Sequence, residues 1–284
     1  MARTFVQVTA AGAALAVALG IGCAAAPLAA QARDTARAPA RPMFTRHDAA
    51  IASALVAGAV ALMPADDWLR GRVEQRGVQS SASAHAVAND FSLLGDPGTV
   101  LLTVGTYAVG RIAGNHTVTD VGLHAAEALV SSAIATELVK GVAGRNRPYL
   151  RRADGDDFLV FGGFTGGGFT SFPSGHTSAA FSLAAVVDEE GAVHWPHAAR
   201  FVTPATYGLA TLVGLSRIYK DRHWVSDVAV GALVGEYSGL IVERYNRRHP
   251  HNALERWLVP SAVVPEHDTG AHGGTGLMVE WSFR

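Results

Sequence analysis

Cysteine and charge are scarce in this sequence. Its 284 residues include one cysteine, Cys23, so no disulfide can form within the chain. Charged residues make up only 17% and hydrophobic residues 49%, and the net charge is -1. A chain without a basic field has little with which to hold a polyanion, which argues against nucleic acid as a partner. Any anion that the protein binds must be held by a local group of residues.

The first 32 residues are predicted to form a secretory signal peptide. Arg3 supplies a positive start, residues 10–26 are apolar, and residues 30–32 read Ala-Gln-Ala, a small-x-small cleavage site. Two alternatives stay open: an uncleaved anchor helix, and a lipoprotein signal that uses Cys23. Residues 33–46 are rich in Ala, Pro and Arg and are predicted to be a linker. We therefore expect a protein that is exported to the cell envelope.

Apolar segments of helical length follow the linker, separated by loops that contain Gly, Pro and charge. They are residues 49–65, 100–111, 121–140, 176–187, 201–217 and 226–244. The pattern predicts an all-α fold, a single-domain bundle of about six main helices over residues 47–250. Only the first segment approaches the roughly 20 apolar residues that span a bilayer. The others are shorter or carry acidic residues, so a soluble bundle and a membrane-embedded one both stay open.

The C-terminal extension, residues 251–284, has a different period. Leu277, Val279, Trp281 and Phe283 alternate with more polar residues, which predicts a strand. An earlier apolar stretch, residues 257–264, lies beyond a loop rich in Gly, His and Asp. The two stretches are predicted to pair as a β-hairpin that packs against the helices.

Polar residues that could bind substrate or take part in catalysis occur first at the end of one predicted helix and at the start of the next. Lys140 and Arg147 lie seven residues apart, where one predicted helix ends. Ser174, Gly175 and His176 lie where the next helix begins, and the backbone N–H groups there can bind an anion. Each pattern alone has an ordinary explanation, since basic residues favour helix C-termini and serine is a common N-cap.

A third segment leads into the last predicted helix and contains Arg217, His223 and Asp227. If His223 lies on the first turn of that helix, Asp227 lies four residues on and faces the same side. A carboxylate in that place can accept the hydrogen of one imidazole nitrogen, which leaves the other nitrogen able to attack. The isolated pair could equally be an ordinary surface pair.

Taken together, the three segments resemble the three-part signature of the type 2 phosphatidic acid phosphatase superfamily. This superfamily includes lipid phosphate phosphatases, bacterial class A acid phosphatases and vanadium haloperoxidases. The resemblance covers about residues 66–242, and no signature residue is missing. The signature reads here as Lys140-x6-Arg147-Pro148, Pro173-Ser174-Gly175-His176 and Ser216-Arg217-x5-His223-x3-Asp227.

The resemblance implies a role for each of these residues. His223 would be the nucleophile that forms a phosphohistidine, and Asp227 would orient it. His176 would protonate the leaving oxygen and then activate water. The resemblance implies neither metal nor cofactor, with vanadate as an inhibitor that mimics phosphate. The residues that would hold the phosphoryl oxygens are Lys140, Arg147, Ser174, Gly175 and Arg217.

The expected protein is an exported phosphatase that hydrolyses a phosphomonoester or diphosphate, with its active site in the periplasm. The apolar helices favour a lipid-linked substrate, such as phosphatidic acid, phosphatidylglycerol phosphate or an isoprenoid diphosphate, and association with the membrane surface. The alternatives are a soluble periplasmic acid phosphatase and a vanadium-dependent haloperoxidase, although nothing in the sequence marks a halide site. No oligomeric state follows from the sequence.

Overall fold

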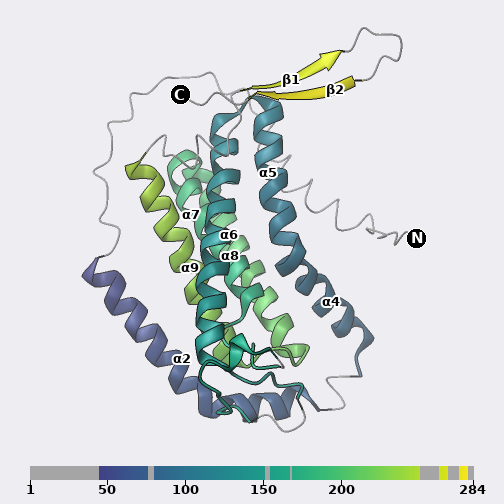
Figure 1. The fold of residues 1–284 in the computed structure, drawn as a ribbon, viewed down its shortest axis with the longest axis vertical. Helices are drawn as coiled ribbons and strands as arrows, with labels where there is room; N and C mark the ends of the chain where they lie inside the picture. Colours follow the sequence, from purple (N-terminus) through teal and green to yellow (C-terminus); the bar gives the residue numbers. More distant parts are fainter. Residues whose placement is uncertain are drawn as a thin grey trace.

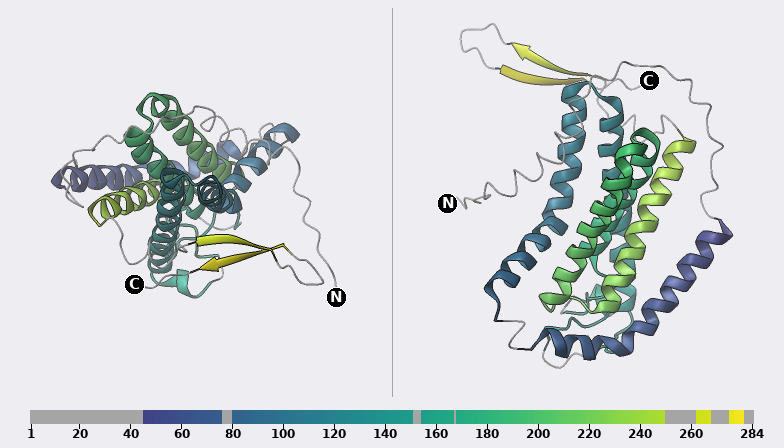
Figure 2. Two further views of the ribbon diagram at one scale, coloured as in Figure 1. Left: turned by 90° about the horizontal axis from the view of Figure 1, so that it is seen from above. Right: turned by 180° about the vertical axis from the view of Figure 1, so that it is seen from behind.

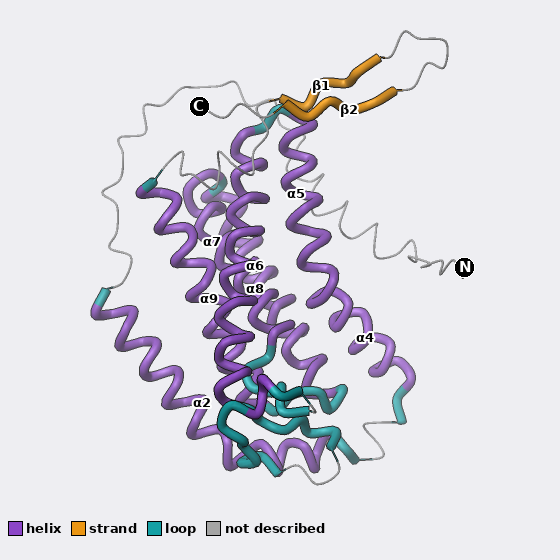
Figure 3. Tube along the Cα trace, in the orientation of Figure 1, coloured by secondary structure: helices purple, strands orange, loops and turns teal. Residues whose placement is uncertain are grey.

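The computed structural model describes residues 45–75, 80–150, 154–166 and 168–249, together with the backbone of two strands further on. The predicted signal peptide and nearly all of the predicted linker lie outside these residues. Helices dominate the described chain (Figure 3). The all-α prediction is therefore confirmed for this part of the protein.

The six predicted helices correspond to α2, α5, α6, α7, α8 and α9. A further helix, α4, was not predicted; it runs into α5 through the π-type turn η1 (Leu94–Gly98). A 3-10 turn, η2 (Gly162–Phe164), follows α6. The helix bounds are Arg46–Val73 for α2, Ala82–Leu93 for α4, Thr99–Ala113 for α5, His116–Ala143 for α6, Gly175–His194 for α7, Pro196–Tyr219 for α8 and Val225–Arg248 for α9.

The centre of the bundle is α7, which packs against α6, α8 and α9 (Figures 1 and 2). Helix α5 packs along α6, α4 packs on α8, and α2 contacts α9 from outside. The helices approach closely because their facing residues are small. A Cβ on Gly235 of α9 would overlap the Ser178 carbonyl oxygen, and one on Gly239 would lie 2.7 Å from Ala185 Cβ.

Small residues also make up most of the buried apolar core, whereas many large apolar residues lie outside. Leu101 and Ile112 of α5, for example, are 67% and 88% exposed. Exposed apolar surface of this extent is typical of a region that contacts a membrane, another protein or an apolar ligand. By length and composition, α2 from Asp48 to Val73 and α9 could each cross a membrane. The core contains Ala125, Ala128, Ala180, Ala184, Ala185, Val186, Ala210 and Val213, and further exposed apolar residues are Val104, Val109, Ile134, Leu138, Phe201 and Leu215.

Helix α2 starts beside the bundle and bends beneath it (Figures 1 and 2). Its start is held by an ion pair in which Arg244 Nη1 lies 2.6 Å from Asp48 Oδ2. Pro64 lies inside the helix, where it removes one backbone hydrogen bond and crowds the preceding turn, which kinks a helix. The predicted helix ends at residue 65, but α2 continues to Val73 and places Asp66 in a buried position.

Two strands follow the bundle, β1 (Ala262–His267) and β2 (Thr275–Glu280). They run antiparallel, with Ala262 opposite Glu280 and His267 opposite Thr275. Their side chains and the residues that flank them lie outside the described residues. The predicted hairpin, and its packing against the helices, therefore stay predictions.

Candidate active site

The three polar segments meet at one end of the bundle, the lower end in Figure 1. Lys140 lies in the last turn of α6, Ser174 is the N-cap of α7, and Asp227 lies in the first turn of α9. They come together because α6 ends at the level where α7 and α9 begin. Arg217 joins them from the last turn of α8.

His223 lies just before α9 and not on its first turn, because Trp224 is the N-cap. Its Nδ1 atom is 2.7 Å from the Ser171 carbonyl oxygen and 3.5 Å from Asp227 Oδ2. A carbonyl oxygen can only accept, so Nδ1 carries the hydrogen and Nε2 keeps its lone pair. The tautomer is therefore set by the Ser171 backbone as well as by Asp227, a contribution that the sequence pattern did not reveal.

Burial lowers the pKa of His223 below its ordinary value, and the positive charges of Arg147 and Arg217 lower it further. The hydrogen bond and charge of Asp227 act in the opposite direction without reversing the shift. The imidazole is therefore neutral near neutral pH. A neutral imidazole with its Nε2 lone pair available is a nucleophile.

Asp227 is fully buried and accepts hydrogen bonds on both oxygens. Oδ2 accepts from the Trp224 backbone N–H at 2.9 Å, which caps α9, and from Ser171 Oγ at 2.5 Å. Oδ1 accepts from Arg145 Nη1 at 2.7 Å. The carboxylate is thus held in one orientation next to the imidazole of His223.

Arg145 is a residue of this site that the sequence did not single out. Besides Asp227, its Nη1 donates to Ser226 Oγ at 2.7 Å. Its Nη2 donates to Asp66 Oδ2 at 2.8 Å and to the Gly155 carbonyl oxygen. Asp66 in turn accepts from the Ser226 backbone N–H at 3.0 Å. In the sequence Arg145 is only one of six unspecified residues between Lys140 and Arg147, and Asp66 carried no signal of this contact.

His176 is the second residue of α7 and lies among the predicted cations. Burial lowers its pKa to about 3, and the positive charges of Arg217, Arg147 and Lys140 add to that effect. In the absence of an anion His176 is therefore neutral. A bound phosphate dianion beside it would favour the protonated form.

Arg147 and Arg217 are anchored by neutral groups. Arg147 Nε donates to Thr170 Oγ1 at 3.2 Å, and Arg217 Nη1 donates to Ser92 Oγ. Burial lowers the pKa of Arg217 to about 10, with the charge of Arg147 contributing. Within the described ranges neither arginine forms an ion pair with a carboxylate. Arg217 is buried and Arg147 is partly buried, and two such cations without a carboxylate partner make a site that favours an anion.

Lys140, Gly175 and Ser174 complete the predicted set. Lys140 forms an ion pair with Glu137, three residues earlier. A Cβ on Gly175 would lie 3.8 Å from Lys140 Nζ, so the first two segments are in contact. Ser174 is fully buried, its backbone N–H donates to the Asp227 carbonyl oxygen at 3.0 Å, and its Oγ accepts from Thr177. The hydroxyl hydrogen is therefore the donor of Ser174 that is left to bind an anion.

A family model described as the PAP2 superfamily matches residues 106–250. Among curated proteins, the lipid A 1-phosphatase of Porphyromonas gingivalis is 35% identical over 107 residues. The match covers 38% of this chain and 21% of that protein, so this chain spans about a fifth of its relative's length.

Two solved structures are similar. A transmembrane PAP2 type phosphatidylglycerolphosphate phosphatase from Bacillus subtilis is 21% identical, with a TM-score of 0.47 over 68% of this chain and 98% of that chain. Aquifex aeolicus LpxE is 23% identical, with a TM-score of 0.45 over 63% of this chain and 94% of that chain.

Proposed function

The chain belongs to the PAP2 superfamily, and on that premise we propose that it is a phosphatase that hydrolyses a phosphate ester or diphosphate carried on a lipid. One observation carries the proposed reaction. The neutral imidazole of His223 has its tautomer set by Ser171 and lies among arginines that, in the described chain, have no carboxylate partner. A phosphoryl group would meet a nucleophile and fixed positive charge in the same place.

In the first step, Nε2 of His223 attacks phosphorus. The N–P bond forms as the P–O bond to the leaving group breaks, and His176 gives its proton to the departing oxygen. Arg147, Arg217 and Lys140 stabilise the charge that grows on the phosphoryl oxygens. Asp227 stabilises the positive charge that His223 acquires.

In the second step, neutral His176 takes a proton from water. The water oxygen attacks phosphorus, the N–P bond breaks, and inorganic phosphate leaves with His223 neutral again. Ser174 and Gly175 are proposed to bind the phosphoryl oxygens in both steps, Ser174 through its hydroxyl hydrogen. Neither step needs a metal or a cofactor.

The lipid part of the proposal rests on the surface of the bundle. The helices place alanine and glycine inside and residues such as Leu101, Ile112 and Phe201 outside. That distribution suits a protein whose outer face contacts hydrocarbon. It disfavours the soluble acid phosphatase alternative. The curated relative is named for a lipid substrate, which agrees with this assignment.

We further propose that the protein is exported and membrane-associated, with its active site facing the periplasm. The signal-like residues 1–32 and the apolar outer surface support this placement. The deciding experiment fractionates the envelope and then assays purified protein, in detergent, against phosphatidic acid and p-nitrophenyl phosphate side by side, with His223→Ala as the blank.

If the proposal is right, the protein is recovered in the membrane fraction, and its kcat/KM is higher for phosphatidic acid than for p-nitrophenyl phosphate. Recovery in the soluble fraction with preference for the aryl ester would favour the soluble acid phosphatase. Phosphate release without vanadate or peroxide would exclude the haloperoxidase alternative.

A further inference from the structure

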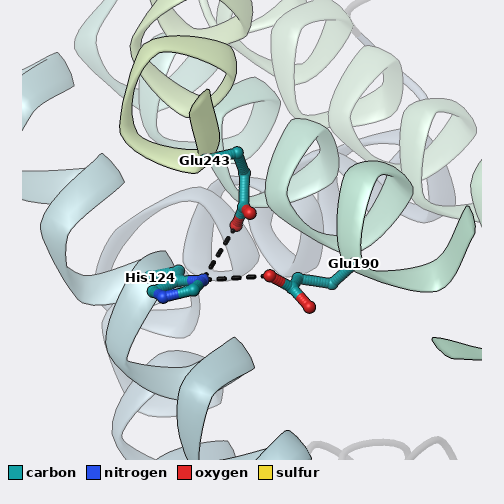
Figure 4. A group of neighbouring side chains, drawn as sticks. All are labelled: His124, Glu190 and Glu243. Atoms are coloured by element: carbon teal, nitrogen blue, oxygen red, sulfur yellow. Dashed lines mark hydrogen bonds and ion pairs between the residues drawn. The ribbon is translucent and has the colours of Figure 1, made fainter. Parts of the chain in front are cut away.

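A second cluster of titratable side chains lies inside the bundle, away from the active site. It consists of His124 of α6, Glu190 of α7 and Glu243 of α9, all buried (Figure 4). One ligand atom from each residue lies within 4.8 Å of the other two. Since His124 and Lys140 are sixteen residues apart on α6, the cluster lies about 24 Å along the helix from the active-site end.

Both carboxylates turn one oxygen toward the same imidazole nitrogen, as Figure 4 shows. His124 Nδ1 is 3.0 Å from Glu190 Oε1 and 3.2 Å from Glu243 Oε1. The other oxygens face basic side chains: His194 Nε2 is 3.1 Å from Glu190 Oε2, and Arg247 Nε is 3.7 Å from Glu243 Oε2. Outer partners that orient carboxylates in this way are typical of metal ligands.

Glu243 is the member of the cluster with the fewest hydrogen bonds. Its side chain has no exposed surface, yet among the residues that the structure describes neither of its oxygens has a hydrogen-bond partner. His124 Nδ1 makes its hydrogen bond to Glu190 and lies 3.2 Å from Glu243 Oε1. A buried carboxylate without such bonds is costly, and a cation between these three groups would satisfy it.

We propose that His124, Glu190 and Glu243 bind one divalent transition metal, with Zn²⁺ the best match. A neutral imidazole and two carboxylates carry two negative charges, which a divalent ion cancels. Zinc ligands at about 2.0–2.2 Å lie roughly 3.4 Å from one another in a tetrahedral site. The observed Nδ1 to oxygen distances therefore need to open only slightly. An imidazole ligand disfavours Mg²⁺ and Ca²⁺, which prefer oxygen.

The proposed metal is structural. Its three ligands join α6, α7 and α9, and the opposite ends of these helices carry Lys140, Gly175 and Asp227. The ion would hold the helices in register at one end and leave the phosphoryl-transfer chemistry at the other untouched. Metal binding can therefore be measured without substrate, so its failure and the failure of the proposed function are distinguishable.

The test uses the full-length chain without an affinity tag. Metal content is measured by mass spectrometry after desalting, and the melting temperature is measured after chelation and during titration with ZnCl2. We expect about one Zn²⁺ per chain and a rise in melting temperature on its return. His124→Gln and Glu243→Gln should lose the bound Zn²⁺ and the rise in melting temperature. The matched control is Glu236→Gln on α9, where the native carboxylate accepts from Tyr207 Oη at 2.7 Å. This variant should keep the bound Zn²⁺ and the rise in melting temperature.

Two results would overturn the proposal. One is an equal Zn²⁺-dependent rise in the wild type and in Glu243→Gln, which would place the metal elsewhere. The other is failure of the wild type to bind Zn²⁺, which would mean that a proton shared among the three side chains, and not a metal ion, compensates the carboxylates. If the variants do not fold, Co²⁺ added to the wild type supplies the readout: a visible ligand-field spectrum that Zn²⁺ abolishes is expected, and its absence contradicts the site.

Discussion

Arg145 donates to Asp227 over 2.7 Å, and both side chains are completely shielded from solvent. The guanidinium binds Oδ1 of the carboxylate, whereas Oδ2 is the oxygen nearest to His223, and the guanidinium is itself held by Asp66 and Ser226. We therefore propose that Arg145 is a positioning residue: it holds Asp227, and Asp227 orients the proposed nucleophile, His223. Removing one partner of such a buried pair costs about 3–5 kcal/mol.

We predict that Arg145→Lys lowers kcat about 100-fold with little change in KM. Lysine keeps the charge but cannot bind Asp227, Ser226 and Asp66 at once, so the imidazole shifts. Arg147→Lys, two residues along, should instead raise KM because Arg147 is proposed to hold the phosphate. Circular dichroism checks that both variants fold. A rise in KM for Arg145→Lys equal to that of Arg147→Lys would contradict the positioning role.

His223→Ala should abolish turnover, and acid-quenched single turnover of the wild type should trap a phosphohistidine. Asp227→Asn should reduce kcat by about 100- to 1,000-fold, since it removes stabilisation of the imidazolium. It should still form the phosphohistidine, because the Ser171 carbonyl oxygen continues to set the tautomer. Recovery of a phosphoserine, or of no covalent species, would refute the assigned roles.

The pH profile should change when substrate binds. In the ligand-free site the pKa of His223 lies below its ordinary value and that of His176 lies near 3, so the optimum of kcat/KM should lie on the acid side of neutral. A bound phosphate dianion raises the pKa of His176. The alkaline limb of kcat should therefore lie at higher pH than that of kcat/KM. Coincident limbs would contradict this coupling.

His176→Asn should remove the alkaline limb of kcat. It should slow alkyl phosphates far more than an activated aryl phosphate, whose departing oxygen needs little protonation. Equal losses on both substrates, with the alkaline limb unchanged, would make His176 a phosphate ligand only. The measurement is kcat for an alkyl phosphate and for an aryl phosphate across a range of pH, for the wild type and for the variant.

Chelation should leave kcat unchanged at the assay temperature, because cationic side chains take the place that metal ions occupy in other phosphatases. Vanadate should compete with substrate, since its five-coordinate form mimics the transition state. Activity that is lost to a chelator and restored by Mg²⁺ or Zn²⁺, with the melting temperature unchanged, would show a metal in the reaction itself.

Close contact between α7 and α9 predicts opposite effects for two glycine substitutions. Gly235→Ala would force the helices apart and should cost about 1–3 kcal/mol of unfolding free energy. Gly208→Ala, on α8 with open space around its Cα, should stabilise by about 0.5–1 kcal/mol. Urea midpoints of the two variants measure both. Destabilisation of similar size in both would show that close packing is not the cause.

The sequence could predict the helices because apolar period and length reflect local burial. It missed α4, which reads ASAHAVANDFSL and has small and polar residues without a clear apolar face. It ended the α7 segment at residue 187, whereas α7 extends to His194. The acidic residues there resembled a loop, but Glu190 is buried against His124.

For the site, the sequence provided the residues on helix ends and could not provide their deeper partners. The Ser171 carbonyl oxygen is a backbone group, which no residue type reveals. The roles of Arg145 and Asp66 depend on contacts between distant segments, and local spacing carries no information about such contacts. The number of helices was therefore more predictable than the network beneath the nucleophile.

The contacts of Asp66, which lies on α2 two residues after Pro64, also bear on when the protein can first become active. Asp66 reaches Ser226, 160 residues later, and Arg145 lies between them. The network that holds Asp227, and with it the proposed nucleophile His223, thus requires α2, the segment around Arg145 and the start of α9 together. During synthesis the chain should remain catalytically silent until α9 has emerged, which delays hydrolysis until the whole domain has been delivered.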